Sequence, residues 1–169
     1  MRIYLRYALF FAAAVALAML LMPRRSGPKV GESAKPIDLP LVTGSSRFSL
    51  AENKGQPLVV EAFASWCSAC RSAAPTLAAA SRARRARPVR FIGVSVDDSP
   101  ERARQAKEEW RIPYDIALDD GRFSKDYAVR LLPTLVVIDA EGRVRRVSSG
   151  RPSAAELESW LGEVGAERL

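Results

Sequence analysis

Two cysteines stand three residues apart, between an apolar run and a segment of helix formers, and this arrangement limits the folds open to the chain. The apolar run is 57–64 (PLVVEAFA), and the segment of helix formers is 65–86, with Cys67 and Cys70 near its start. A short apolar run of this length is typical of a buried strand. A strand that leads directly into a helix predicts the first half of a strand–helix–strand unit, with Cys67 at the helix N-terminus.

The rest of the chain continues this alternation. Ser99 as N-cap and Pro100 at the first helical position predict the start of another helix. The expected elements are a hairpin-like lead at 37–50, strands at 89–97 and 114–118, helices at 99–110 and around 121–129, a hairpin at 133–150 and a last helix at 153–165. Single helical crossovers between strands predict an α/β fold, with a mixed sheet flanked by helices. Trp110 and Trp160 are expected to lie in the core or on buried helix faces.

The positive charge lies mainly before this domain. The chain has a net charge of +7, yet from Val30 onward it has 21 Lys or Arg against 19 Asp or Glu. Basic residues that flank an apolar segment indicate a membrane partner, and no segment resembles a nucleic-acid-binding motif. We therefore expect no nucleic acid among the partners.

An uncharged run, 7–22 (YALFFAAAVALAMLLM), predicts a transmembrane anchor, because a bilayer core requires a helix of about 20 residues and the preceding residues extend this run. The alternative is a cleaved secretory signal with its A-x-A match at 16–18, but the apolar run continues past that match. We expect a basic flank at 1–6, the anchor at 7–22, a linker at 23–35 rich in Pro, Gly and charge, and the folded domain at 36–169.

The residue types present exclude several kinds of chemistry. The chain has no histidine, so it has neither a Ser-His-Asp triad nor a histidine metal site. Two cysteines are too few for the usual four-ligand zinc site, and a disulfide that closes so short a loop would stabilise the fold weakly. We expect no metal and no cofactor, and we interpret the pair as a redox dithiol.

The spacing of the cysteines suits that chemistry. At a helix N-terminus, free N–H groups and the helix dipole stabilise the thiolate of Cys67. Cys70 lies one turn later and is close enough to attack a mixed disulfide formed by Cys67. Cys67 is therefore predicted to be the nucleophile and Cys70 the resolving cysteine.

From about residue 34 to residue 161 the sequence resembles the thioredoxin-like superfamily, and within it the TlpA/ResA type of membrane-tethered disulfide reductase, with its redoxin domain. The motifs that carry the resemblance are WCSAC at 66–70, Pro75 inside the helix, LLPT at 131–134, Gly142, Gly150, and the extra strand and helix within 91–139. Two positions depart from the family pattern. The dipeptide between the cysteines is Ser-Ala, and Ala73 stands where some of these reductases have a glutamate.

The resemblance implies roles for four further residues. Pro133 is expected to be cis and to pack against the disulfide, and Trp66, Leu132 and Pro133 are expected to contact the substrate. The alternatives for Trp66 are that it covers the disulfide or only packs. Glu61 stands six residues before Cys67, where thioredoxin has a buried acid. A carboxyl group that faces inward would have a raised pKa and would accept a proton from Cys70. The alternative for Glu61 is a solvated position at the edge of the sheet.

The implied activity is thiol–disulfide exchange that reduces protein disulfides outside the cytoplasm, with cytochrome c maturation as one setting. The expected partners are disulfide-containing protein substrates, a membrane thiol–disulfide electron donor and the bilayer around 7–22. We expect a monomer, held by a single span in the bacterial inner membrane, with its domain facing the periplasm or the cell exterior. Two alternatives are a peroxiredoxin-like thiol peroxidase, against which Ala64 stands three residues before Cys67, and a non-catalytic binding module.

Overall fold

A computed structural model describes residues 27–83, 88–97 and 99–165, together with seven positions between 4 and 17: Tyr4, Tyr7, Phe11, Ala12, Ala14, Val15 and Leu17. Within this part of the chain, no helix has the length and apolar character needed to cross a membrane. Most of the predicted anchor at 7–22 lies outside the described residues, so the anchor stays a prediction.

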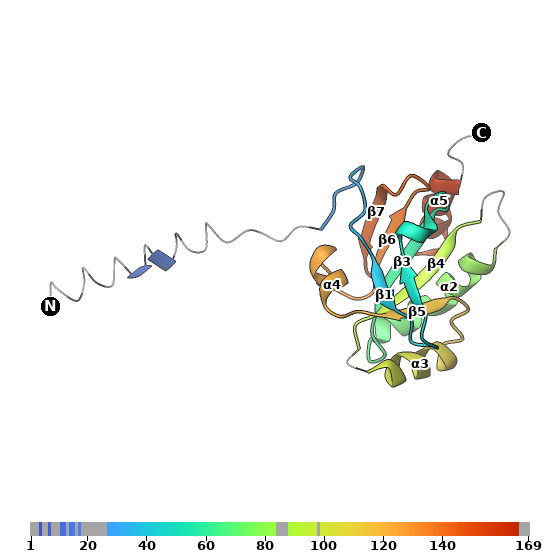
Figure 1. Ribbon diagram of the computed structural model, residues 1–169, viewed down its shortest axis with the longest axis horizontal. Helices are drawn as coiled ribbons and strands as arrows, with labels where there is room; N and C mark the ends of the chain where they lie inside the picture. The colour runs from blue at the N-terminus through green and yellow to red at the C-terminus, as the bar shows by residue number, and fades with distance from the viewer. Residues whose placement is uncertain are drawn as a thin grey trace.

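The core of the domain is a five-stranded mixed sheet (Figure 1). Its strand order is β5 (Asp115–Leu118), β4 (Arg90–Ser95), β3 (Leu58–Phe63), β6 (Thr134–Ile138) and β7 (Val144–Ser149). The central strand β3 runs parallel to β4 and antiparallel to β6, and the outer pairs are parallel for β4–β5 and antiparallel for β6–β7. This is the predicted thioredoxin-like α/β arrangement.

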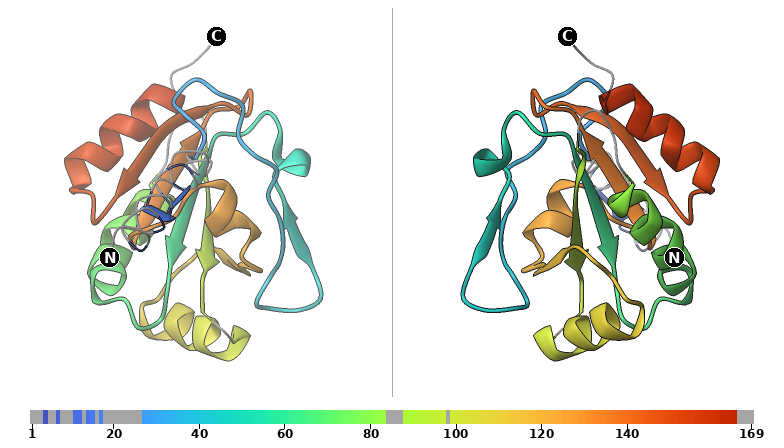
Figure 2. Two further views of the ribbon diagram at one scale, coloured as in Figure 1. Left: turned by 90° about the vertical axis from the view of Figure 1, so that its left-hand side faces the viewer. Right: turned by 90° about the vertical axis from the view of Figure 1, so that its right-hand side faces the viewer.

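Three helices cover one face of the sheet: α2 (Ser68–Arg82), α3 (Pro100–Glu109) and α5 (Ala154–Gly165). Alternate residues of the strands, such as Val59 and Phe63, face this layer and pack with Leu77 of α2 and Leu161 of α5. Figure 2 shows α2 in green and α5 in red on the same side of the sheet. The cysteines belong to this layer too, because both lie in its buried cluster.

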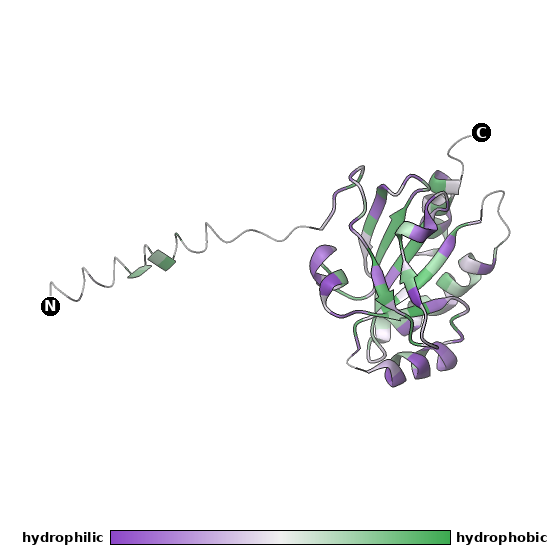
Figure 3. Ribbon diagram, viewed as in Figure 1, coloured by the Kyte–Doolittle hydropathy of each residue, from purple (hydrophilic) through white to green (hydrophobic). Residues whose placement is uncertain are grey.

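The opposite face is covered by a two-stranded hairpin, β1 (Asp38–Pro40) and β2 (Arg47–Ser49), and by α4 (Arg122–Asp126). A single 3-10 turn, η1 (Ala51–Asn53), follows the hairpin. Leu39 and Phe48 of the hairpin and Phe123 of α4 pack there with Val60 of β3. The central strands are accordingly apolar on both faces, whereas α3 is largely hydrophilic (Figure 3). The hairpin confirms the lead predicted at 37–50.

The helix ends follow from local chemistry. Ser99 caps α3 as predicted, with its hydroxyl accepting a hydrogen bond from the backbone N–H of Arg102. The helix α2 is shorter than the segment 65–86: it begins at Ser68, after Cys67 as N-cap, and ends at Arg82, because Ala83 is extended. Trp160 of α5 is buried, and Trp110 lies partly buried with its ring edge against Phe63, so both occupy the kind of position expected.

Candidate active site

The two cysteines form a disulfide where the central strand passes into α2. The S–S distance is 2.15 Å and the Cα–Cα distance is 5.3 Å. Cys67 is the N-cap of α2, and its Sγ accepts a hydrogen bond of 3.1 Å from the backbone N–H of Cys70. Cys67 keeps 8% of its surface exposed, whereas Cys70 keeps none. The predicted position of Cys67 at the helix N-terminus is confirmed, and Cys67 is the cysteine that a partner can reach.

A buried carboxylate from the neighbouring strand holds the loop that carries Trp66 and Cys67. Asp97, two residues after the end of β4, accepts hydrogen bonds from the backbone N–H of Ser65 at 2.8 Å and from its hydroxyl at 2.7 Å. The hydroxyl of Ser95 donates to the same carboxylate at 2.7 Å. Asp97 is 4% exposed, so these hydrogen bonds are shielded from solvent. It presents Trp66, which is 69% exposed, beside the disulfide.

The loop before β6 lies at the same end of the sheet. The Leu132–Pro133 peptide bond is cis, which confirms that prediction. Because Thr134 pairs with Ala62 near the end of β3, Pro133 lies next to the point where β3 leads into the cysteines. Leu132 is only partly buried and packs against both core clusters, whereas Leu131 is the exposed leucine of this loop, at 66%.

Glu61 is a buried acid in the middle of β3. It is 3% exposed, and strand alternation turns it toward the layer of Val59 and Phe63 that contains the dithiol. The hydroxyl of Tyr114 donates a hydrogen bond of 2.8 Å to Glu61 Oε2. Burial raises the pKa of Glu61 from 4.5 to about 7, and the Tyr114 hydrogen bond opposes part of that rise. The solvated-edge alternative for Glu61 is therefore wrong.

The sequence matches known proteins across this same domain. The sequence model of the Redoxin family matches residues 29–161. The chain belongs to the redoxin family. Among curated relatives, this redoxin is 33% identical to the thiol:disulfide interchange protein DsbE of Xylella fastidiosa (strain 9a5c), over 78% of this chain and 67% of that protein. It is 26% identical to the sporulation thiol-disulfide oxidoreductase A of Bacillus subtilis, over 66% of this chain and 70% of the relative.

Solved structures agree on the fold. The crystal structure of a thiol-disulfide isomerase from Corynebacterium glutamicum superposes with a TM-score of 0.72 at 23% identity, covering 82% of this chain and 98% of that one. The fold, the family and the disulfide-forming Cys67–Cys70 pair together make this redoxin a thiol–disulfide oxidoreductase. The predicted resemblance to thioredoxin-like disulfide reductases is thereby confirmed.

Two residues of the site were not anticipated from the sequence of this redoxin. Tyr114 is the first residue of the short strand predicted at 114–118, and nothing local to it indicates a contact with a carboxylate 53 positions away. Asp97 follows the strand at 90–95. A carboxylate just past the end of a buried strand is only a weak indication of a residue that belongs to the site. Both residues act through others: Tyr114 contacts Glu61, and Asp97 holds the loop of Trp66.

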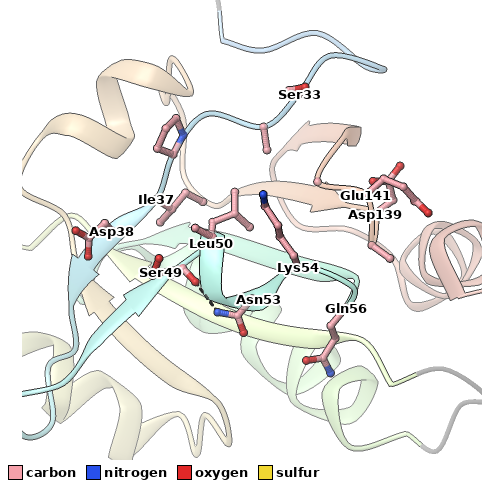
Figure 4. A pocket seen from close by; sticks show the side chains of 15 residues that line it. Ser33, Ile37, Asp38, Ser49, Leu50, Asn53, Lys54, Gln56, Asp139 and Glu141 are labelled. Carbon is pink, nitrogen blue, oxygen red and sulfur yellow. Dashed lines mark hydrogen bonds between the residues drawn. The ribbon is translucent and has the colours of Figure 1, made fainter.

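A pocket lies at the end of the sheet opposite the dithiol. This pocket of about 460 Å³ lies between the β1–β2 hairpin, η1 and the β6–β7 turn, and Lys54, Asp139 and Glu141 are among its lining residues (Figure 4). It contains no cysteine, because the only two cysteines of the chain form the disulfide. Among the residues that the structure describes, no cluster of three or more acidic or cysteine side chains is suited to hold a metal ion. The dithiol end is therefore the candidate active site.

Proposed function

We propose that this oxidoreductase reduces disulfide bonds of proteins outside the cytoplasm, with Cys67 as nucleophile and Cys70 as resolving cysteine. The observation that carries the proposal is the unequal placement of the two sulfurs. Cys67 keeps 8% of its surface exposed and accepts a backbone hydrogen bond at the start of α2, whereas Cys70 is fully enclosed. Free N–H groups and the helix dipole favour the thiolate at Cys67.

The exchange proceeds in two displacements. The Cys67 thiolate attacks one sulfur of the substrate disulfide, a mixed disulfide forms, and the other substrate sulfur leaves as a thiolate. Cys70 then loses its proton and attacks Cys67 Sγ, which forms the Cys67–Cys70 disulfide and releases the second substrate sulfur. Two electrons pass from the enzyme dithiol to the substrate, and the structure has the oxidised pair that results.

Glu61 is proposed to accept the proton that Cys70 loses. Its pKa of about 7 lies close to neutral pH, where a carboxyl group both accepts and returns a proton readily. Cys70 and Glu61 face the same buried layer, and Cys70 has no exposed surface through which bulk water would take the proton. Glu61, a buried acid in the same layer, supplies the acceptor for the proton of Cys70.

The membrane attachment is part of the proposal. The uncharged run at 7–22, followed by a linker at 23–35, supports a single anchor in the bacterial inner membrane, with the domain on the periplasmic or outer side. A tether suits a reductase that receives its electrons from a membrane thiol–disulfide donor. The similarity to tethered reductases supports disulfide-containing proteins as substrates, with apocytochrome c as one of them.

The equilibrium redox potential of Cys67–Cys70 against glutathione tests the direction of the reaction. A value near that of thioredoxin, about −270 mV, is expected for a reductase, whereas a value near −120 mV, typical of a strong oxidant, would contradict the proposal. Reduction of insulin with dithiothreitol as electron source tests for turnover, with the Cys67→Ser variant as the inactive control.

A gene fusion tests the topology. Alkaline phosphatase fused after Leu169 is expected to be active, because that enzyme folds only where its disulfides form. An inactive phosphatase fusion, paired with a bright fluorescent-protein fusion at the same point, would place the domain in the cytoplasm and overturn the topology.

A further inference from the structure

Three exposed arginines lie at the end of the sheet that carries the disulfide. Arg71 lies four residues after Cys67 and therefore on the same face at the start of α2. Arg102 of α3 lines a groove of about 260 Å³ together with Trp66. Arg151 directly follows Gly150, whose N–H donates a hydrogen bond of 2.7 Å to the carbonyl of Pro133. The three side chains thus come from segments far apart in the sequence that lie at the same end of the sheet.

These arginines are not used to hold the fold together. In the described part of the chain, the guanidinium groups of Arg71, Arg102 and Arg151 form no ion pair and no hydrogen bond. All three side chains are exposed. A partner with carboxylates can therefore approach them without breaking an existing interaction.

Four acidic residues described at this end of the sheet already have partners within the protein. Asp97 is buried and holds the loop before Trp66, and Asp119 accepts backbone N–H bonds at the start of α4. Asp120 forms an ion pair with the adjacent Arg122, at 2.7 Å. Glu109, the one carboxylate that lines the Trp66 groove, accepts a hydrogen bond of 2.8 Å from the amide of Gln105. Each of these four carboxylates thus already has a partner within the protein, whereas the three guanidinium groups have none in the described part of the chain.

Apolar surface accompanies this charge. Trp66 and Leu131 are 69% and 66% exposed, and they stand beside Cys67 and before Pro133 respectively. Among the large apolar side chains that the structure describes from residue 27 to residue 165, only Val30, at 67%, is exposed to a similar extent. Exposed apolar side chains next to a reactive group indicate contact with a partner.

We propose that this face selects substrate disulfides whose flanking residues are acidic, with an apolar substrate residue against Trp66 and Leu131 and carboxylates against Arg71, Arg102 and Arg151. The inference rests on the proposed reductase function and specifies its substrate class. Complementary charge around a reactive centre acts mainly by raising the rate of productive encounter, so the selection should appear in the second-order rate constant.

Three disulfide peptides test the selection. They share one apolar residue and one internal disulfide and differ only in three flanking positions, which are Glu, Gln or Lys. The full chain, reduced beforehand and held in micelles of neutral detergent, is mixed with each peptide, and the rate of reduction is measured. The Glu peptide is expected to react about tenfold faster than the Lys peptide at low ionic strength, with the Gln peptide between them. The gap should narrow as salt is added, because the Debye length falls from about 10 Å at 0.1 M to about 3 Å at 1 M.

Charge-reversal variants assign the effect to this face. Arg102→Glu and Arg151→Glu should each lower the Glu-to-Lys rate ratio several-fold. Lys54→Glu makes the same change of charge in an exposed residue at the opposite end of the sheet, and it should leave the ratio unchanged. Equal sensitivity of the ratio to all three variants would mean that net charge, not this face, is responsible, and would overturn the inference.

The possible failures are distinguishable. Equal rates for the three peptides, or a faster Lys peptide, would overturn the substrate selection while leaving the reductase function intact. Reduction of none of the peptides would overturn the reductase function and the inference with it. Loss of the preference when anionic lipid replaces the neutral detergent would assign the arginines to the membrane surface, and would also overturn the inference.

Discussion

Replacing Glu61 with Gln should make the stability of the protein less dependent on pH. The pKa of Glu61 is raised by burial from 4.5 to about 7 in the folded protein, whereas in the unfolded chain the carboxyl group is solvated. Between these two values the folded state keeps a proton that the unfolded state has released. The stabilising contribution is therefore fully present below pH 4.5 and is lost as the pH rises through 7.

The magnitude follows from the width of that interval. Each pH unit between the two pKa values is equivalent to about 1.36 kcal/mol, so the rise from 4.5 to about 7 corresponds to about 3 kcal/mol. From pH 4.5 to pH 8 the free energy of unfolding of the unmodified protein should fall by about 3 kcal/mol more than that of Glu61→Gln. All other titrating groups are shared by the two proteins, so the difference isolates Glu61.

Urea unfolding of the oxidised full chain, followed by circular dichroism at several pH values, measures this difference. Tyr114→Phe provides the matched test of the hydrogen bond. Removing the hydroxyl that donates to Glu61 should raise the pKa of Glu61 further, by about one to two pH units, because a hydrogen bond to a charged group contributes about 1.5–3 kcal/mol. The loss of stability should then extend to correspondingly higher pH. Parallel pH profiles for the unmodified protein and Glu61→Gln would refute the reasoning.

Three further outcomes are expected. Cys70→Ser should accumulate mixed disulfides with substrate on non-reducing gels, whereas Cys67→Ser should accumulate none; faster alkylation of Cys70 than of Cys67 in the reduced protein would contradict this assignment. Gly93→Ala should lower the free energy of unfolding by about 1–3 kcal/mol in urea titrations, because the added Cβ would lie 3.0 Å from the Phe63 ring inside the sheet. Trp66→Ala should slow insulin reduction while changing the free energy of unfolding by less than about 0.5 kcal/mol, because the side chain is 69% exposed, and a large loss of stability would show that Trp66 supports the fold instead.

Local patterns in the sequence determined the order of the elements and the place of the dithiol. Apart from Glu61, the run 57–64 is apolar on both sets of alternating positions, as expected of a central strand covered on both faces, and β3 is buried throughout. The start of α3 depends on Ser99 and its immediate neighbours, and the place of Cys67 depends on the junction of strand and helix. Such features are predictable because they arise from residues a few positions apart.

Only the tertiary structure decided which groups surround the disulfide. Tyr114 reaches Glu61 across 53 positions, and Asp97 reaches the loop of Ser65 across 32. Neither hydrogen bond follows from local spacing, because each depends on the lateral order of β3, β4 and β5 in the sheet. The loop before β6 illustrates the same limit. Two consecutive leucines are indistinguishable in the sequence, and packing against both cores half-buries Leu132 while Leu131 faces outward.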